Sequence, residues 1–294
     1  MQPVSSTDYA RPAVPFAAAT GGILVFTTVD AIVKALPHGV PVTEVVAMCF
    51  LFAIPVALVA VWRTGAGWPT RTSWQANVPR GVLRTGSTAL FFVALRRLPF
   101  AEALTLGYLS PLLVALMASS VLGERLRAGV LGAVSLGLCG VGVIAWSSLT
   151  DQQALSADLV GIAAAFGSAV TYAANNVMLR SQAQRDSATS IVLIQQIVPA
   201  IVAMPMAAAT WATPPVPVWF AFALLGGLGV GGHFLLTWAY RRAQAGVLAS
   251  VDYLALPYAA LLGFFCFGEV PTQALWTGAA LIVAACLIVT RLRK

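Results

Sequence analysis

Long apolar segments separated by short polar links follow one another along the whole chain. Each segment ends at Pro, Gly or charged residues and is long enough to cross a hydrocarbon core of about 30 Å as an α-helix. The segments cover residues 13–35, 43–62, 78–95, 101–121, 129–147, 157–179, 188–210, 216–239, 245–267 and 273–290. We expect helices rather than a β-barrel because the alternation of a barrel is missing. Only the links 63–77 and 148–156 have room for much loop.

The composition agrees with a chain that is embedded in a membrane. Of its 294 residues, 59% are hydrophobic and 9% charged, and the mean hydropathy is +0.86. Soluble proteins contain about 25% charged residues. The net charge of +7 does not indicate a nucleic-acid partner, because the basic residues stand singly or in pairs between apolar segments. The first apolar segment is too long for a signal peptide, so we expect it to be retained.

The distribution of Lys and Arg predicts how the chain is oriented. If residues 1–12 form a cytoplasmic tail, Lys34, Arg96 and Arg97 lie outside, and Arg84 lies within a segment. The other thirteen basic residues then lie inside: Arg11, Arg63, Arg71, Arg80, Arg125, Arg127, Arg180, Arg185, Arg241, Arg242, Arg291, Arg293 and Lys294. Such an excess follows the positive-inside rule. It predicts a multi-pass protein of the inner membrane with both termini cytoplasmic, the second one being the basic tail 291–294.

An internal repeat divides the chain into residues 13–147 and 157–290. A shift of 145 positions pairs the following residues: Gly22 with Gly167, Gly81 with Gly226, Gly86 with Gly231, Ala94 with Ala239, Arg96 with Arg241, Arg97 with Arg242, Tyr108 with Tyr253, Leu109 with Leu254, Gly123 with Gly268, and Glu124 with Glu269. Five helices are an odd number, so the second copy enters the membrane from the opposite side. We therefore predict an all-α fold of ten transmembrane helices, built as two inverted five-helix repeats around a central solute cavity.

These features resemble the drug/metabolite transporter superfamily, and within it the EamA-type ten-helix exporters. The resemblance rests on two five-helix halves, an Arg-rich step before each fourth helix, and a Gly-Glu pair after it, at 123–124 and at 268–269. Pro111, Pro257 and the Trp-Thr-Gly opening of the last helix at 276–278 agree with it. The resemblance implies a basket whose cavity is lined by helices 1–4 and 6–9, with helices 5 and 10 at the periphery. It also implies similarity to YddG-like exporters of aromatic and other amino acids.

Polar side chains at membrane depth are the candidates for the substrate site, because they are costly unless they face water or a partner. Tyr172, Asn175 and Asn176 share one helical face, and an amide suits both ends of a zwitterion. Of the adjacent Gln195 and Gln196, we expect one to face the cavity and the other to pack. Hydrogen bonding between helices is the alternative role for Tyr172, Asn175 and Asn176.

Charged and aromatic residues complete the predicted site. His233 follows a cluster of glycines and is a candidate for substrate or proton binding, or a core histidine. Arg84 either extends its side chain to the interface or attracts an anionic group. Tyr108 and Tyr253 precede the two prolines and are predicted cavity walls, because interrupted helices mark the sites of such transporters. The candidates for a gate or proton site are Asp30, Lys34 and Asp252. Asp30 and Lys34 are spaced i, i+4, so an ion pair between them is the default expectation.

The predicted function is secondary transport, namely export of amino acids or related small metabolites by alternating access. A phosphate-ester, nucleotide-sugar or drug transporter is the alternative within transport, and a membrane-embedded enzyme for lipid-linked substrates is the alternative outside it. No Walker, GxSxG or HExxH motif is present, so we expect no enzyme and no ATP-driven step. The four cysteines stand apart in apolar segments, and no metal or other cofactor is predicted. The expected partners are a small-molecule substrate and the lipid bilayer, and the chain is a monomer or a homodimer.

Overall fold

The computed structural model is an all-helical bundle. It describes residues 13–65, 67–110, 112–114, 116–117, 128–150, 155–182, 188–240 and 255–292. The helices are α1 (Ala13–Ala35), α2 (Val42–Thr64), α3 (Arg71–Arg97), α4 (Phe100–Gly107), α6 (Ala128–Thr150), α7 (Leu155–Gln182), α8 (Ala188–Ala209), α9 (Val216–Tyr240), α11 (Ala255–Phe267) and α12 (Gln273–Leu292). A described helix lies in every segment that the hydrophobic pattern predicts.

Several of these helices have the length and hydropathy of membrane spans. Among the described residues, four segments meet both criteria: Val14–Ala35, Val42–Thr64, Thr189–Ala209 and Val216–Leu236. Shorter apolar helices lie at Ser135–Ile144, Ala255–Phe267 and Gln273–Ala285. Some of their large apolar side chains are exposed on the outside of the bundle, such as Val59 of α2 and Phe220 of α9, as a lipid-facing surface requires.

The link predicted at 63–77 is wrong in its second half, because α3 begins at Arg71. The hydroxyl oxygen of Thr70 accepts a hydrogen bond of 3.2 Å from the amide of Ser73 and so caps the helix. The first turns are polar and therefore escape a hydropathy pattern, yet Ser73 and Asn77 are buried. α3 is stabilised here by packing and hydrogen bonds rather than by lipid.

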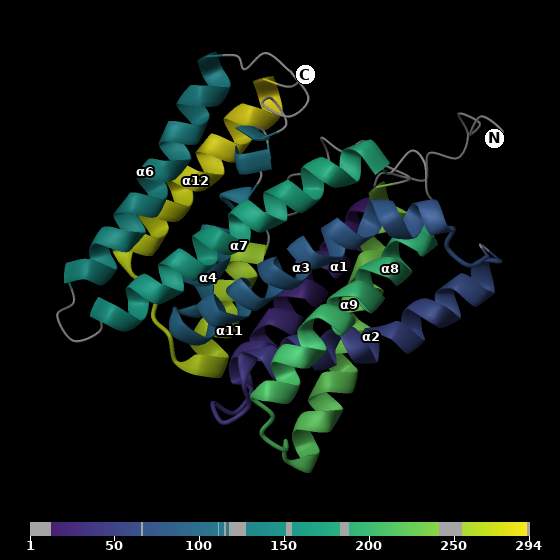
Figure 1. The fold of residues 1–294 in the computed structure, drawn as a ribbon. Helices are drawn as coiled ribbons and strands as arrows, with labels where there is room; N and C mark the ends of the chain where they lie inside the picture. Colours follow the sequence, from purple (N-terminus) through teal and green to yellow (C-terminus); the bar gives the residue numbers. More distant parts are fainter. Residues whose placement is uncertain are drawn as a thin grey trace.

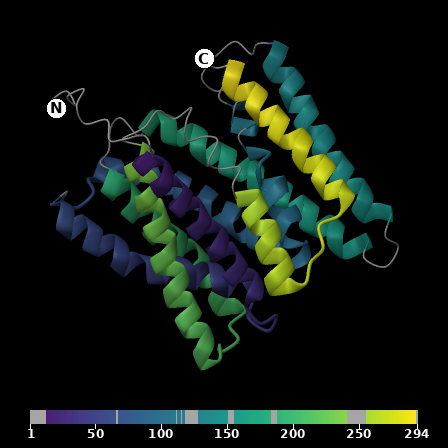
Figure 2. The ribbon, with the colours of Figure 1, turned by 180° about the vertical axis from the view of Figure 1, so that it is seen from behind.

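The helices pack in a crossed arrangement that joins distant parts of the sequence. α1 packs on α9, α2 on α8 and α9, α3 on α7 and α8, and α4 on α11. α6 and α12 pack on each other and form one flank of the molecule (Figures 1 and 2). α1, α2, α3, α8 and α9 gather on the other side of α4 and α11, and α7 contacts α3, α4 and α6 (Figure 1).

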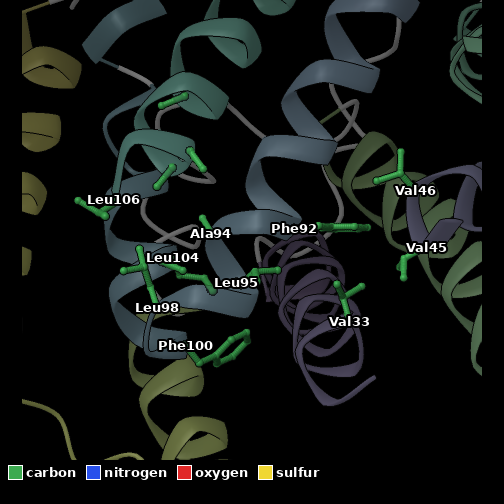
Figure 3. Close-up of a cluster of buried hydrophobic side chains, with 14 of the residues drawn as sticks. Val33, Val45, Val46, Phe92, Ala94, Leu95, Leu98, Phe100, Leu104 and Leu106 are labelled. Carbon is green, nitrogen blue, oxygen red and sulfur yellow. The ribbon is translucent and has the colours of Figure 1, made fainter. Parts of the chain in front are cut away.

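A continuous apolar core holds the first four helices together. It includes Val33 of α1, Val45 of α2, and Phe92 and Leu95 of α3. Figure 3 shows these side chains meeting between the helices, with Phe100 at the start of α4 nearby. Because these side chains are almost completely buried, this core fixes how α3 lies against its neighbours.

Glycines allow the closest helix crossings. A Cβ on Gly81 of α3 would lie 2.5 Å from the Val198 side chain of α8. A Cβ on Gly226 of α9 would lie 2.6 Å from the backbone carbon of Phe52 and 2.7 Å from the backbone nitrogen of Ala53, both in α2. The shift of 145 positions that pairs the two glycines also pairs Ala53 with Val198. The two crossings are thus made by corresponding positions.

Candidate functional site

Arg84 and His233 meet inside the bundle. Arg84 is the central residue of α3, and its Nη2 lies 2.9 Å from Nε2 of His233 on α9. A guanidinium group only donates hydrogen bonds, so this imidazole nitrogen accepts and the ring proton sits on Nδ1. The Arg84 side chain is therefore directed toward α9, which places a cationic group within the bundle.

Aromatic rings from other helices surround this pair. The ring of Phe26 on α1 meets the His233 imidazole edge-on, with centroids 4.8 Å apart. The Arg84 guanidinium carbon lies 5.5 Å from the ring centroid of Phe50 on α2, within cation–π range. Tyr172 on α7 lies close enough to interact electrostatically with Arg84, and its side chain is half exposed. Side chains of α1, α2, α3, α7 and α9 thus converge on one cationic centre.

The structure therefore brings together three predicted site residues, Arg84, Tyr172 and His233. The other predicted residues of α7 follow on the same helix: Asn175 is buried and Asn176 is half-buried. Within the part of the chain that the structure describes, Oδ1 of Asn175 has no hydrogen-bond partner. An unsatisfied buried amide oxygen is costly, so it is a group that a bound donor can satisfy.

The two glutamines of α8 belong to a second polar cluster between α8 and α3. Both are buried, with Gln195 2% and Gln196 3% exposed. Nε2 of Gln195 donates to the carbonyl of Asn77 at 3.3 Å, and Arg80 donates to Oδ1 of Asn77 at 2.6 Å. Gln195 is thus held against α3 near the close crossing at Gly81.

Tyr108 lies where α4 is interrupted. α4 ends at Gly107, and Tyr108 caps it with a half-buried side chain. Position 111 is a proline, which has no N–H to donate to the Gly107 carbonyl four residues earlier. The Ser110 hydroxyl donates to that carbonyl instead, at 2.6 Å. The predicted interruption of this helix is present, whereas Pro111, Asp252 and Tyr253 lie outside the described residues.

The ion pair predicted between Asp30 and Lys34 does not form. Among the described residues, Nζ of Lys34 pairs instead with Oε1 of Glu269 at 2.7 Å and also donates to the carbonyl of Leu98 at 2.5 Å. Asp30 lies close enough to Cys49 of α2 for electrostatic interaction. The lysine reaches past the end of α1, where it meets a carboxylate and a carbonyl at once, and one i, i+4 pair contributes only about 0.2–0.5 kcal/mol.

Three contributors were missing from the predicted site, namely Phe26, Phe50 and Glu269. The two phenylalanines are indistinguishable from other apolar residues until the helices are packed. Glu269 carries a signal in the sequence, because the shift of 145 positions pairs it with Glu124. No group of three His, Cys, Asp or Glu side chains is placed to bind a metal within the described ranges.

A comparison of the sequence with protein-family profiles identifies the family of this chain. The profile of the EamA-like transporter family matches residues 16–146 and again residues 159–291, which together make up most of the chain. The chain belongs to the EamA-like transporter family. As a member of the drug/metabolite transporter superfamily, this EamA-like transporter is a membrane transporter and not an enzyme.

Relatives of this EamA-like transporter carry different named solutes. It is 27% identical to the pseudopaline exporter CntI of Pseudomonas aeruginosa (strain UCBPP-PA14), over 92% of this chain and 93% of that protein. It is 30% identical to a riboflavin transporter of Rhizobium johnstonii, over 82% of this chain and 77% of that protein. A 32% identity to the S-adenosylmethionine uptake transporter of Rickettsia bellii covers 41% of this chain and 42% of that protein. The relatives thus include both an exporter and an uptake protein.

The fold of the EamA-like transporter is also found among solved structures. A crystal structure 23% identical in sequence superposes with a TM-score of 0.64, and the match covers 96% of this chain and 99% of that chain. The similarity extends over nearly the entire length of both proteins, so the helical arrangement is shared as a whole.

Proposed function

We propose that this protein exports amino acids, including aromatic ones, or related carboxylate-bearing metabolites from the cytoplasm by alternating access. The observation that carries the proposal is the Arg84–His233 pair between α3 and α9. A guanidinium binds a carboxylate through two parallel hydrogen bonds, which are stronger than its single contact with a neutral imidazole. Phe50 supplies aromatic surface beside the guanidinium and Phe26 beside the His233 imidazole, which suits an aromatic side chain.

The proposed architecture is ten transmembrane helices in two inverted five-helix repeats. Two observations support it. The family profile matches the chain twice, once in each half. The close crossings at Gly81 and Gly226 involve corresponding positions of the two halves, as a two-fold axis in the membrane plane requires. The proposed orientation has both termini on the cytoplasmic side of a bacterial inner membrane, because this choice puts thirteen basic residues inside, as the positive-inside rule favours.

A transport assay with purified protein tests the proposed substrate class. Proteoliposomes loaded with a labelled amino acid are expected to release it faster than empty liposomes, whereas the methyl ester of the same amino acid is expected to be released at the background rate. The ester lacks the negative charge that Arg84 recognises, and the release of each compound is taken as the excess over protein-free liposomes loaded with the same compound. Riboflavin, S-adenosylmethionine and a sugar phosphate complete the panel, with and without a proton gradient. Equal release of acid and ester would contradict the role of Arg84.

Buried Arg80, one turn before Arg84, is the observation that favours phosphate esters as a second candidate. Two guanidinium groups on one face of a helix suit a doubly charged phosphate better than they suit a carboxylate. In the structure, Arg80 donates to Asn77 at 2.6 Å, which draws it toward the polar cluster of α8. Faster release of the sugar phosphate than of every amino acid in the same assay would favour this second function.

A further inference from the structure

Three polar contacts link α1, the start of α4 and the end of α11 at one end of the bundle. Lys34 of α1 forms its 2.7 Å ion pair with Glu269, just after α11. The other carboxylate oxygen of Glu269 accepts the amide of Phe100, the first residue of α4, at 2.6 Å. Lys34 also donates to the carbonyl of Leu98. We call Lys34, Glu269 and these two backbone groups of Leu98 and Phe100 the Lys34–Glu269 latch.

The turn after α11 holds Glu269 in this position. Gly268 has a φ of +67°, a conformation in which glycine avoids the strain of other residues. Its amide donates to the Phe264 carbonyl at 3.1 Å, and the Glu269 amide donates to the Gly263 carbonyl at 3.0 Å. The carboxylate is thereby turned from the end of α11 toward α1 and α4.

Aromatic contacts reinforce the same junction. Nζ of Lys34 lies 5.4 Å from the ring centroid of Phe267, the last residue of α11. That ring lies 5.9 Å from the ring of Phe100, whose side chain is fully buried. Further along the bundle, the hydroxyls of Thr28 on α1 and Tyr258 on α11 are 3.1 Å apart. Each of these contacts connects α11 with α1 or α4, so α11 cannot move away from them without breaking the latch.

We propose that the Lys34–Glu269 latch is the gate that closes the transport pathway at its external end. This inference rests on the proposed alternating-access mechanism but not on the identity of the substrate. Its contacts join the first half of the chain to the second, and the halves must separate at one end when the pathway opens there. With α1 starting in the cytoplasm, its carboxyl end and the latch lie on the external side.

The exposure of the ion pair suits a contact that opens and closes repeatedly. The side chain of Lys34 is 13% exposed and that of Glu269 is 24% exposed. A completely buried pair is costly to break, because each charge is left without a partner in an apolar medium. Here water already reaches both groups and can solvate them when they separate, so the barrier to opening stays small.

Thiol accessibility tests the gate without any substrate. Ala259 of α11 is fully buried about two turns before the end of that helix, and Ala259→Cys in a variant whose four cysteines are replaced by alanine provides the reporter. A membrane-impermeant anionic thiol reagent is added outside intact cells. Glu269→Gln, which keeps the size of the side chain and removes its charge, is expected to raise the rate of modification about tenfold, in the range of measured coupling between conformational states.

Charge reversal and a matched charge removal make the test specific. The double variant K34E/E269K is expected to recover only part of the slow modification, because it restores the ion pair with opposite polarity but loses the contacts to the Leu98 carbonyl and the Phe100 amide. Arg97→Gln removes an exposed charge from the same end and is expected to leave the rate unchanged. All variants are checked for a monodisperse size-exclusion profile. If single variants are misfolded, recovery of a monodisperse protein in the double variant still supports the pair.

Two results would overturn the gate. One is that the cysteine at position 259 reacts with the thiol reagent in the Glu269→Gln and Lys34→Gln variants at the same rate as in the protein with the intact latch. The other is a double variant that recovers neither slow modification nor monodispersity. Because no solute is needed for labelling, a failure of amino-acid transport in proteoliposomes leaves this result unaffected, and the two proposals fail separately.

Discussion

Replacement of Arg84 by alanine is expected to reduce transport of carboxylate-bearing substrates by about a hundredfold or more, in line with the loss of one partner from a buried hydrogen-bonded charge pair. The guanidinium lies inside the bundle, against His233 and Phe50, where little water can replace it as a partner for a carboxylate. The variant also leaves Nε2 of His233 without its donor. Initial rates of amino-acid release from proteoliposomes measure the effect.

Two further variants separate the charge of Arg84 from its geometry. Arg84→Lys keeps the charge but loses the planar fork that binds both carboxylate oxygens, so it is expected to recover only part of the activity. Arg63→Ala removes an exposed cation at the end of α2 and serves as the matched control, with near-normal rates expected. A fully active Arg84→Ala protein would move the substrate site away from this pair.

The second large effect concerns the crossing of α9 with α2. A Cβ on Gly226 would lie 2.6 and 2.7 Å from backbone atoms of Phe52 and Ala53, which cannot move aside as a side chain can. Gly226→Ala is therefore expected to push the helices apart and to lower the midpoint of thermal unfolding by about 10 °C, from about 3 kcal/mol of overpacking. Small residues at such crossings allow the close approach that stabilises helix pairs in lipid. Thermal unfolding of the purified protein in detergent measures the shift.

The neighbouring glycine provides a control with the same chemistry. A Cβ on Gly227 meets nothing within 4 Å, so Gly227→Ala gains helix propensity and is expected to be neutral or stabilising. Gly81→Ala and Gly86→Ala repeat the comparison on α3, where Gly81 is tight against Val198 and Gly86 is open. If Gly226→Ala and Gly227→Ala unfold at the same temperature, the crossing is looser than the structure indicates.

The positions of the helices were largely predictable from sequence. α1 spans Ala13–Ala35, as the apolar pattern predicts, and α8 ends within one residue of its predicted limit. The pattern works because apolar length is what the bilayer selects. It failed at the start of α3, where Arg71 and Asn77 continue the helix through polar turns whose stability comes from a cap and from burial.

The membership of the candidate site was only partly predictable. Arg84, Tyr172 and His233 were identified because polar groups are conspicuous in apolar segments, and the structure brings these three together. Gln195 and Gln196 gave the same signal; both are buried, and Gln195 donates to the backbone of α3. Sequence position alone does not say whether a polar residue meets a cavity or a neighbouring helix, because that depends on how each helix is rotated.

By itself, the sequence determined that this protein lies in a membrane, where its helices run, and which polar groups are unusual at that depth. These properties follow from local composition and from the length needed to cross a bilayer. The tertiary structure decided the partners: Arg84 with His233, and Lys34 with Glu269 rather than Asp30. Partners between helices depend on crossing angles and on close approach at glycines such as Gly226. Both arise only when residues far apart in the chain are packed together.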